Sequence, residues 1–210
     1  ILLEGLRRLE YRGYDSAGFA LIDRAGQLSS HKTLGRVAAL EAVQMATPLS
    51  GGTGIAHTRW ATHGAPSVAN AHPHVINDRI AVVHNGIIEN HELFRSALTA
   101  QGCEFASETD TEVVAHLIAL AIEEGGHDLV AAVQQVLPKL QGAYALAVID
   151  RESPNQLVVA RQGSPLVLGV GLGEYFAGSD TLALQSVTDT FIYLEEGDVA
   201  QLTADGYAIF

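Results

Sequence analysis

The distribution of strand-like segments constrains the fold of this chain more than any other feature of its sequence. From Ala143 onward the chain is a succession of short apolar stretches separated by turn residues, a pattern typical of buried strands. A single short helix, over residues 181–185 behind Asp180, is predicted among them. A repeating βαβ fold would alternate strands with helices, so the pattern argues against one. The stretches cover residues 144–149, 157–160, 166–170, 175–177, 191–194, 199–202 and 207–210.

The other predicted elements group their helices in the middle of the chain. Asn90 is expected to cap one helix, and Thr109 with Glu112 forms a capping-box pattern before the next. Many buried strands with grouped helices predict an α+β fold in which two packed sheets are flanked by helices. No linker divides residues 1–210, so one domain is expected. The helices are expected up to about residue 10 and over 37–45, 90–100, 113–124 and 128–137, and the strands over 19–23, 28–34, 54–56, 80–83 and 103–106.

Composition and charge narrow the classes of function. The chain has 210 residues, 48% of them apolar and 17% charged, as in an ordinary globular protein. Its net charge of −12, from 12 Lys and Arg against 24 Asp and Glu, argues against a nucleic-acid partner. No apolar run is long enough to span a membrane. A single cysteine, Cys103, excludes an internal disulfide framework and indicates the cytoplasm.

Both ends of the chain are expected to be truncated. Leu2, Leu3 and Leu6 have helical spacing with no capping residue ahead of them. The strand-like run over residues 207–210 continues to the last residue. Further residues are therefore expected on both sides, and loss of a first strand would open the edge of a sheet.

Residues 57–64, with the sequence His-Thr-Arg-Trp-Ala-Thr-His-Gly, gather polar side chains where a strand-like run meets a glycine. The guanidinium of Arg59 can match a carboxylate with two parallel charge-assisted hydrogen bonds. Thr62 and His63 offer further polar contacts beside it. The pattern predicts a binding loop for a small carboxylate, although a surface salt bridge beside a half-buried Trp60 would use the same residues.

Asn85-Gly86 and Asp110 each allow a functional and a structural interpretation. At a strand end, the Asn85 amide and the Gly86 N–H are the two components of an oxyanion hole. Asn-Gly is also a strong signal for a type I′ hairpin turn, which the sequence alone favours. Asp110, near a helix start, could bind a substrate ammonium, but such an aspartate more commonly interacts only with the helix dipole.

Neither a metal site nor a cysteine nucleophile is predicted within these residues. His72, His74 and His84 are near one another in sequence, but no carboxylate or cysteine stands at ligand spacing. Cys103 has neither a base nor a positive charge among its sequence neighbours, so it is interpreted as a small half-buried residue.

Four motifs, taken together and in this order, resemble one family. They are residues 9–18, Leu-Glu-Tyr-Arg-Gly-Tyr-Asp-Ser-Ala-Gly; 57–64, given above; 84–91, His-Asn-Gly-Ile-Ile-Glu-Asn-His; and 107–112, Ser-Glu-Thr-Asp-Thr-Glu. They closely resemble the class II glutamine amidotransferases, and among these the glutaminase domains of glucosamine-6-phosphate synthases. The resemblance extends over nearly all 210 residues.

The resemblance implies an N-terminal-nucleophile hydrolase fold, a four-layer αββα sandwich, and an enzyme that hydrolyses L-glutamine to L-glutamate and ammonia. In that family, the residue matching Arg59 binds the substrate α-carboxylate, and the one matching Asp110 binds its ammonium. By the same resemblance, the pocket is lined by Trp60, Thr62 and His63, the oxyanion hole is formed by Asn85 and Gly86, and Arg12 lies near the nucleophile.

The family's nucleophile is the first residue of the mature chain, a cysteine whose own α-amino group acts as the base. The first residue here is Ile1, so that cysteine is expected upstream and this chain alone is expected to be inactive. The full enzyme would be a cytoplasmic homodimer that passes ammonia to sugar-phosphate isomerase domains of the same polypeptide, forming glucosamine 6-phosphate from fructose 6-phosphate without metal or cofactor. The alternatives are a glutaminase that serves another acceptor, and a non-catalytic amino-acid-binding domain.

Overall fold

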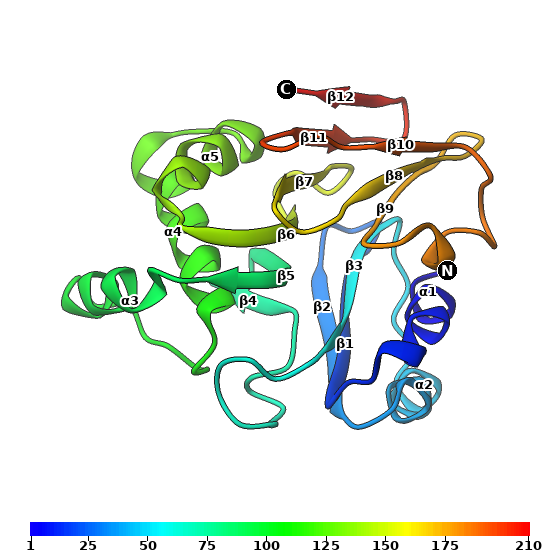
Figure 1. The fold of residues 1–210 in the computed structure, drawn as a ribbon, viewed down its shortest axis with the longest axis horizontal. Helices are drawn as coiled ribbons and strands as arrows, with labels where there is room; N and C mark the ends of the chain where they lie inside the picture. Colours follow the sequence, from blue (N-terminus) through cyan, green and yellow to red (C-terminus); the bar gives the residue numbers. More distant parts are fainter.

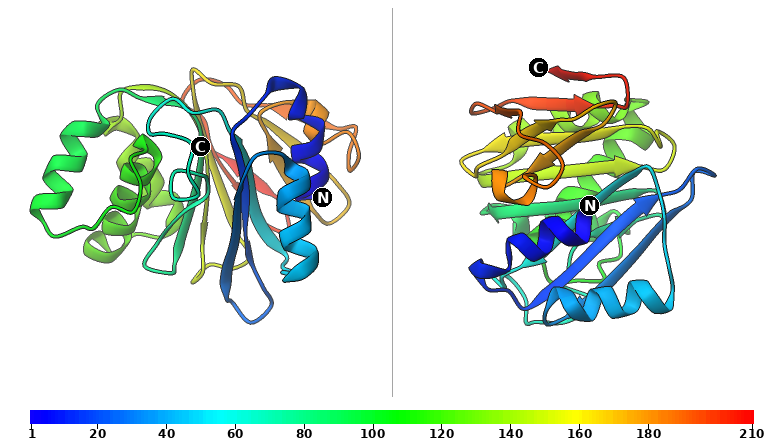
Figure 2. Two further views of the ribbon diagram at one scale, coloured as in Figure 1. Left: turned by 90° about the horizontal axis from the view of Figure 1, so that it is seen from below. Right: turned by 90° about the vertical axis from the view of Figure 1, so that its right-hand side faces the viewer.

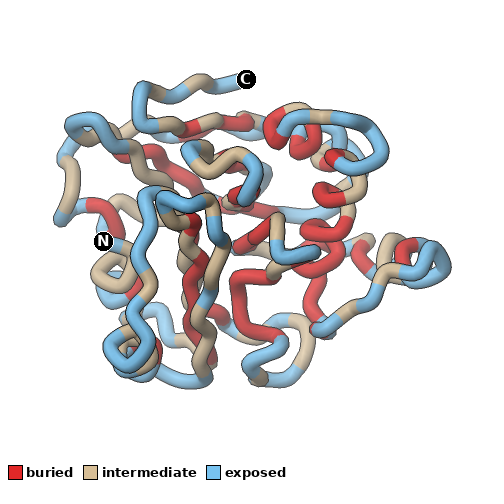
Figure 3. The backbone as a smooth tube through the Cα atoms, turned by 180° about the vertical axis from the view of Figure 1, so that it is seen from behind, coloured by how far each residue is buried: buried red, intermediate tan, exposed pale blue.

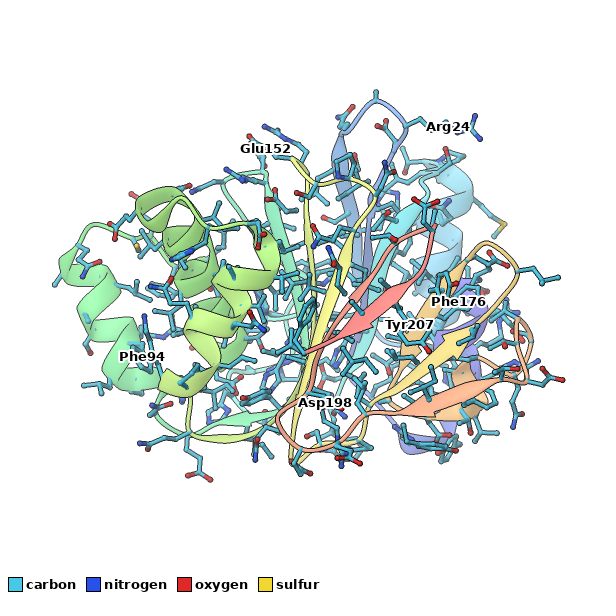
Figure 4. All side chains as sticks on the ribbon, turned by 90° about the horizontal axis from the view of Figure 1, so that it is seen from above. Arg24, Phe94, Glu152, Phe176, Asp198 and Tyr207 are labelled. Atoms are coloured by element: carbon cyan, nitrogen blue, oxygen red, sulfur yellow. The ribbon has the colours of Figure 1, made fainter.

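The computed structural model describes all 210 residues, which form four layers in the order helix, sheet, sheet, helix (Figures 1 and 2). The view from above also shows this order, with α3–α5 on one side and α1–α2 on the other (Figure 4). The αββα sandwich that the resemblance implied is therefore confirmed. None of the helices has the length and apolar character needed to cross a lipid bilayer.

A six-stranded antiparallel sheet forms the first β layer, with strand order β12-β11-β7-β6-β5-β4. Its long central pair, β5 and β6, keeps one register from Ile80↔Asp150 to Ile88↔Gly142. The strands are β4 (His74–Ile76), β5 (Ile80–Ile88), β6 (Gly142–Asp150), β7 (Leu157–Gln162), β11 (Val199–Leu202) and β12 (Tyr207–Ile209).

Two helices, α4 (Asp110–Gly125) and α5 (Leu129–Val136), cover the outer face of this sheet, and α3 (His91–Ala100) packs against α4. The main apolar core lies between α4, α5 and the sheet, and it includes Val82, Ile118 and Leu146, which are at most 1% exposed. Burying each such side chain contributes about 1.5–3 kcal/mol. Figure 3 shows α4 buried along most of its length, whereas α3 is mainly exposed. The buried position of α4 against the sheet fixes the start of this helix, where Asp110 lies.

The second β layer consists of two separate three-stranded sheets, with orders β2-β1-β3 and β10-β8-β9. The sequence-based expectation of one sheet in this layer was therefore incomplete. Strands β3 and β9 are each at the end of their sheet. The strands are β1 (Ser16–Ile22), β2 (Leu28–Leu34), β3 (Thr53–Arg59), β8 (Val167–Val170), β9 (Tyr175–Gly178) and β10 (Phe191–Tyr193).

The remaining helices cover the outside of this second layer. Leu6, Phe19 and Leu40 join α1 and α2 to the outer face of β1 in one apolar cluster. The elements are α1 (Leu2–Arg8), α2 (Val37–Ala46) and the short 3₁₀ helices η1 (Glu10–Arg12) and η3 (Thr181–Ala183); a third 3₁₀ turn, η2 (Leu137–Lys139), follows α5.

Some predicted boundaries were wrong because strand pairing overrode the local pattern. β1 begins at Ser16 rather than residue 19, because Ser16 pairs with both Leu34 and Arg59. The first helix ends at Arg8, before η1. Residues 103–106 are not a strand, and β4 was not predicted. β4 is only three residues long, too short for a visible alternation of apolar and polar side chains.

Two predicted helix caps also differ from the structure. The Asn90 side chain makes no cap hydrogen bond. It instead donates to the Lys139 carbonyl and accepts from the Gln141 N–H, so it joins the start of α3 to the start of β6. Thr109 does cap α4 by accepting from the Glu112 N–H at 3.4 Å. The Glu112 carboxylate, however, accepts from the N–H groups of Ala106 and Ser107, so the reciprocal half of the capping box is absent.

Candidate active site

A cavity of about 550 Å³ is lined by residues of both β layers, among them residues of β3 and β9. Side chains reach it from η1, from the end of β3 and the loop after it, from β5, and from the start of α4. All the side chains that the sequence analysis singled out for the site line this one cavity: Arg12, Arg59, Trp60, Thr62, His63, Asn85, Gly86 and Asp110.

Arg59 is the last residue of β3, and it is only 4% exposed. The predicted binding loop is therefore shorter than residues 57–64, because His57, Thr58 and Arg59 belong to the strand. Nη2 of Arg59 donates to the carbonyls of His63 and, at 2.9 Å, Gly64. These bonds close the loop into a turn around the guanidinium. The charge is thus fixed at the cavity wall, with Nε–H and part of Nη1 left for a ligand.

Asp15 supports the candidate site from behind Arg59, and the sequence analysis did not single it out. One of its carboxylate oxygens lies 3.5 Å from Nη1 of Arg59, and the other accepts from the Ala61 N–H at 2.5 Å. Asp15 therefore holds both the guanidinium and the loop after it. The sequence feature that could have identified Asp15 is its position in the motif over residues 9–18, just before the strand that pairs with β3.

Asn85 and Gly86 lie within β5, not at its end. Asn85 pairs with Ala145 and Gly86 with Tyr144 of β6, so the hairpin turn that the sequence favoured is wrong. Gly86 has φ +141°, and a Cβ there would lie 2.0 Å from the Ala143 carbonyl oxygen. Only glycine fits this backbone. The Asn85 side chain is exposed on the cavity surface, where its amide can donate to a ligand.

Asp110 is the first residue of α4 and is 4% exposed. Its Oδ2 accepts from the Ile88 N–H at 2.8 Å and lies 3.8 Å from Nδ1 of His84. The carboxylate thus ties the start of α4 to the end of β5 while lining the cavity. It does more than favour the helix dipole, which was the commoner interpretation of its sequence position.

Three further histidines, His57, His72 and His84, line the cavity. The rings of His57 and His72 stack with centroids 4.3 Å apart, and His72 Nδ1 accepts from the backbone N–H of His84 at 3.3 Å. Burial is the main cause that lowers the pKa of each of these imidazoles below its ordinary value. They are therefore neutral at pH 7 and add polar atoms without adding positive charge beside Arg59. No group of three or more His, Cys, Asp or Glu is arranged to hold a metal ion.

Arg12 and Trp60 form part of the exposed rim. Nη2 of Arg12 lies 2.6 Å from Oδ2 of Asp180, and Nη1 donates to the Ser179 hydroxyl at 3.3 Å. Arg12 thus joins η1 to the residues that follow β9. Trp60 is 68% exposed.

Cys103, in contrast, does not line the cavity. Burial is the main cause that raises the pKa of its thiol, and the nearby Glu123 and Glu124 raise it further. The structure therefore places the only thiol of the chain away from the candidate site and in a form that disfavours the reactive thiolate.

The cavity thus presents a buried guanidinium, a buried carboxylate and a side-chain amide beside a glycine in a strand. This set suits a zwitterionic amino acid whose side chain carries a carbonyl group. The family described as glutamine amidotransferase domain matches residues 57–186. The chain belongs to this glutamine amidotransferase domain family.

Relatives of known name are similar over the whole chain. The glutamine–fructose-6-phosphate aminotransferase (isomerizing) of Salmonella paratyphi A is 58% identical, and the protein of the same name from Pseudomonas aeruginosa is 56% identical, each over 210 residues. The matches cover 100% of this chain but 34% of each relative, so the chain spans about one third of their length.

Solved structures share the fold. The glutamine phosphoribosylpyrophosphate amidotransferase from B. subtilis, in complex with ADP and GMP, has a TM-score of 0.84 at 28% identity and is matched over 99% of this chain and 45% of its own. A glutamine aminotransferase class-II domain protein from Silicibacter pomeroyi has a TM-score of 0.61 at 19% identity, over 93% of this chain and 90% of its own.

Proposed function

We propose that this chain is the glutaminase part of a larger enzyme, which hydrolyses L-glutamine and uses the ammonia to convert fructose 6-phosphate to glucosamine 6-phosphate. The observation that carries the glutaminase proposal is the convergence of Arg59, Asn85 and Asp110 on one cavity. The choice of acceptor is supported by the names of the relatives at 58% and 56% identity.

In this proposal, the substrate binds by the two charges on its α-carbon. Arg59 donates to the α-carboxylate, and Asp110 accepts from the ammonium. Thr62, His63 and Trp60 contact the rest of the ligand, and Arg12 closes the mouth near the reacting end. The amide of Asn85 and the N–H of Gly86 donate to the side-chain carbonyl oxygen as it becomes an oxyanion.

We further propose that the nucleophile is a cysteine upstream of Ile1 in the complete polypeptide. Its thiolate attacks the amide carbon, and its α-amino group, with an ordinary pKa of about 7.7–8.0, moves the proton that releases ammonia. Water then hydrolyses the thioester to L-glutamate. Ile1 and Leu2 line the cavity, so the segment that leads into α1 is close to the site.

The lining of the cavity also supports an upstream strand. It includes residues 54–59 of β3 and 175–178 of β9, the end strands of the two small sheets. Such edges present unpaired backbone groups that pair readily with another strand. An upstream strand placed there would join the two sheets into one and bring its cysteine to Asn85 and Asp110.

Three further statements about the whole protein are proposals as well: isomerase domains on the same polypeptide, a homodimer and a cytoplasmic location. They rest on the resemblance and on the relatives' names. The alternative that the domain serves another acceptor is favoured only by the structural match to the phosphoribosylpyrophosphate amidotransferase, which shares 28% of its residues.

A diazoketone analogue of L-glutamine is expected to label the complete polypeptide at its N-terminal cysteine only. The reason is that Cys103 lies outside the cavity with a raised pKa, and even an ordinary thiol is only a few per cent thiolate at pH 7. Peptide mass spectrometry locates the adduct. As a control, Cys103→Ser should be labelled at the wild-type rate. Rapid stoichiometric labelling of Cys103 would overturn the proposed mechanism.

Asp110→Asn is expected to reduce the preference of the complete enzyme for L-glutamine over glutaramate, which lacks the α-amino group. The new amide oxygen can still accept from the Ile88 N–H, so the fold should persist, but the charge that pairs with the ammonium is lost. A hydrogen bond to a charged group is worth about 1.5–3 kcal/mol. The ratio of kcat/KM for the two substrates measures the effect. Equal preference in both proteins would leave Asp110 with only its structural role.

A further inference from the structure

Asn70 is buried in the chain between β3 and β4, and it contacts both sides of the candidate site. Its relative exposure is 3%. Nδ2 donates to the Ala65 carbonyl at 2.8 Å and to the Glu108 carboxylate at 3.1 Å. Oδ1 accepts from the Glu108 N–H at 2.9 Å. One amide thus joins the loop after β3 to the segment before α4, and Asn70 and Glu108 are 38 residues apart in sequence.

The first of these contacts supports Arg59. The carbonyls of His63 and Gly64 hold Nη2 of Arg59, and Ala65, which Asn70 binds, is the next residue. Gly64 has φ +78°, and a Cβ there would lie 2.5 Å from Nδ2 of Asn70. The turn around the guanidinium is therefore packed directly on the Asn70 amide.

The second contact supports Asp110. Glu108 lies two residues before Asp110, and Asn70 holds both its backbone and its side chain. A second hydrogen bond, between Nε2 of His74 and Oγ1 of Thr109 at 2.9 Å, holds the neighbouring residue. The segment that positions Asp110 is therefore bound to the same stretch of chain that positions Arg59.

We propose that Asn70 is a positioning residue that determines substrate specificity, because it sets the spacing between the carboxylate-binding Arg59 and the ammonium-binding Asp110. The inference rests on the proposed function. The two charges of an α-amino acid are on groups attached to one carbon, so both contacts form only at one separation of Arg59 and Asp110. Charge-assisted hydrogen bonds are short, about 2.7–2.9 Å, and a shift of a few tenths of an ångström weakens them.

Asn70→Ala in the complete enzyme tests this role. The KM for L-glutamine is expected to rise about tenfold, as lost hydrogen bonds of ordinary strength imply, while kcat changes by less than about threefold. The preference for L-glutamine over glutaramate is expected to fall by a similar factor. The reason is that Arg59 can still bind a carboxylate, but Asp110 is no longer held where the ammonium lies. A fall in kcat with unchanged KM and unchanged preference would overturn the inference.

Two milder changes keep the test valid if Asn70→Ala folds poorly. Glu108→Ala removes only one contact from an exposed side chain, and it should shift KM and preference in the same direction by a smaller factor. The double variant Asn70→Asp with Glu108→Gln reverses the amide and carboxylate of the pair. It is expected to restore only the part of the preference that Asn70→Asp loses by placing two carboxylates together, because an aspartate cannot donate to the Ala65 carbonyl. No restoration would contradict a role for this pair.

Asn90→Ala is the matched control. The Asn90 amide also joins two backbone segments, donating to the Lys139 carbonyl at 2.9 Å and accepting from the Gln141 N–H at 3.0 Å. This variant should lose a similar amount of thermal stability but keep the wild-type preference. An equal loss of preference in Asn90→Ala would show that general loosening, not Asn70, is responsible. A wild-type enzyme with no preference for the amino group would instead refute the proposed role of Asp110, and the inference with it.

Discussion

Asn85→Ala is expected to lower kcat for glutamine hydrolysis by about 10²–10³ in the complete enzyme, which is the usual effect of removing one oxyanion-hole donor. KM for L-glutamine should change much less, because the amide acts on charge that develops only in the tetrahedral state. The backbone of Asn85 pairs with Ala145 in the middle of β5, while its side chain is exposed on the cavity surface. The substitution therefore leaves the strand pairing intact.

Thermal unfolding distinguishes this catalytic role from a structural one. Because no turn depends on Asn85, the melting temperature of Asn85→Ala should lie within a few degrees of the wild-type value. Asn90→Ala provides the comparison, since it removes two side-chain hydrogen bonds that join α3 to β6. It should lower stability more and kcat less. A large loss of stability in Asn85→Ala with kcat retained would contradict its assignment to the oxyanion hole.

The layered fold could be predicted because it depends on local patterns. Apolar segments after Ala143 marked the strands, helical spacing marked α4 and α5, and the predicted cap Thr109 accepts from the Glu112 N–H. The resemblance supplied the order of the layers. The split of the second layer into two sheets could not be predicted, because it depends on which strand edges pair across the fold.

The cavity residues could be predicted individually, but their supporting contacts could not. Arg59 and Asp110 lie in motifs that collect polar groups at the ends of elements. Asp15 and Asn70 support them through hydrogen bonds that span 46 and 38 residues of sequence. No periodicity or spacing encodes such contacts. Asn85-Gly86 shows the opposite problem: its local signal for a turn was strong, but pairing with β6 along the whole of β5 decided the backbone.

Arg59→Lys is expected to raise KM for L-glutamine by about 10- to 150-fold, the equivalent of about 1.5–3 kcal/mol for a hydrogen bond to a charged group. In the wild type, one guanidinium donates to the carbonyls of His63 and Gly64 and still faces the cavity with other N–H groups. A lysine ammonium is a point charge without the planar fork of a guanidinium. It cannot bind the two loop carbonyls and also present two parallel donors to a carboxylate. The charge beside Asp15 is kept, so folding should persist.

Initial rates over a range of glutamine concentrations separate the effect of Arg59→Lys on KM from its effect on kcat. In the proposed binding mode, Arg59 contacts the α-carboxylate, which does not react, so its loss should affect binding of the ground state and of the transition state alike. The result should therefore appear in KM, with kcat reduced much less. Arg24→Lys is the matched control, since Arg24 is exposed at the turn between β1 and β2 (Figure 4) and does not line the cavity. A KM for Arg59→Lys equal to that of Arg24→Lys would show that Arg59 only closes the loop after β3. Another group would then have to bind the carboxylate of the substrate.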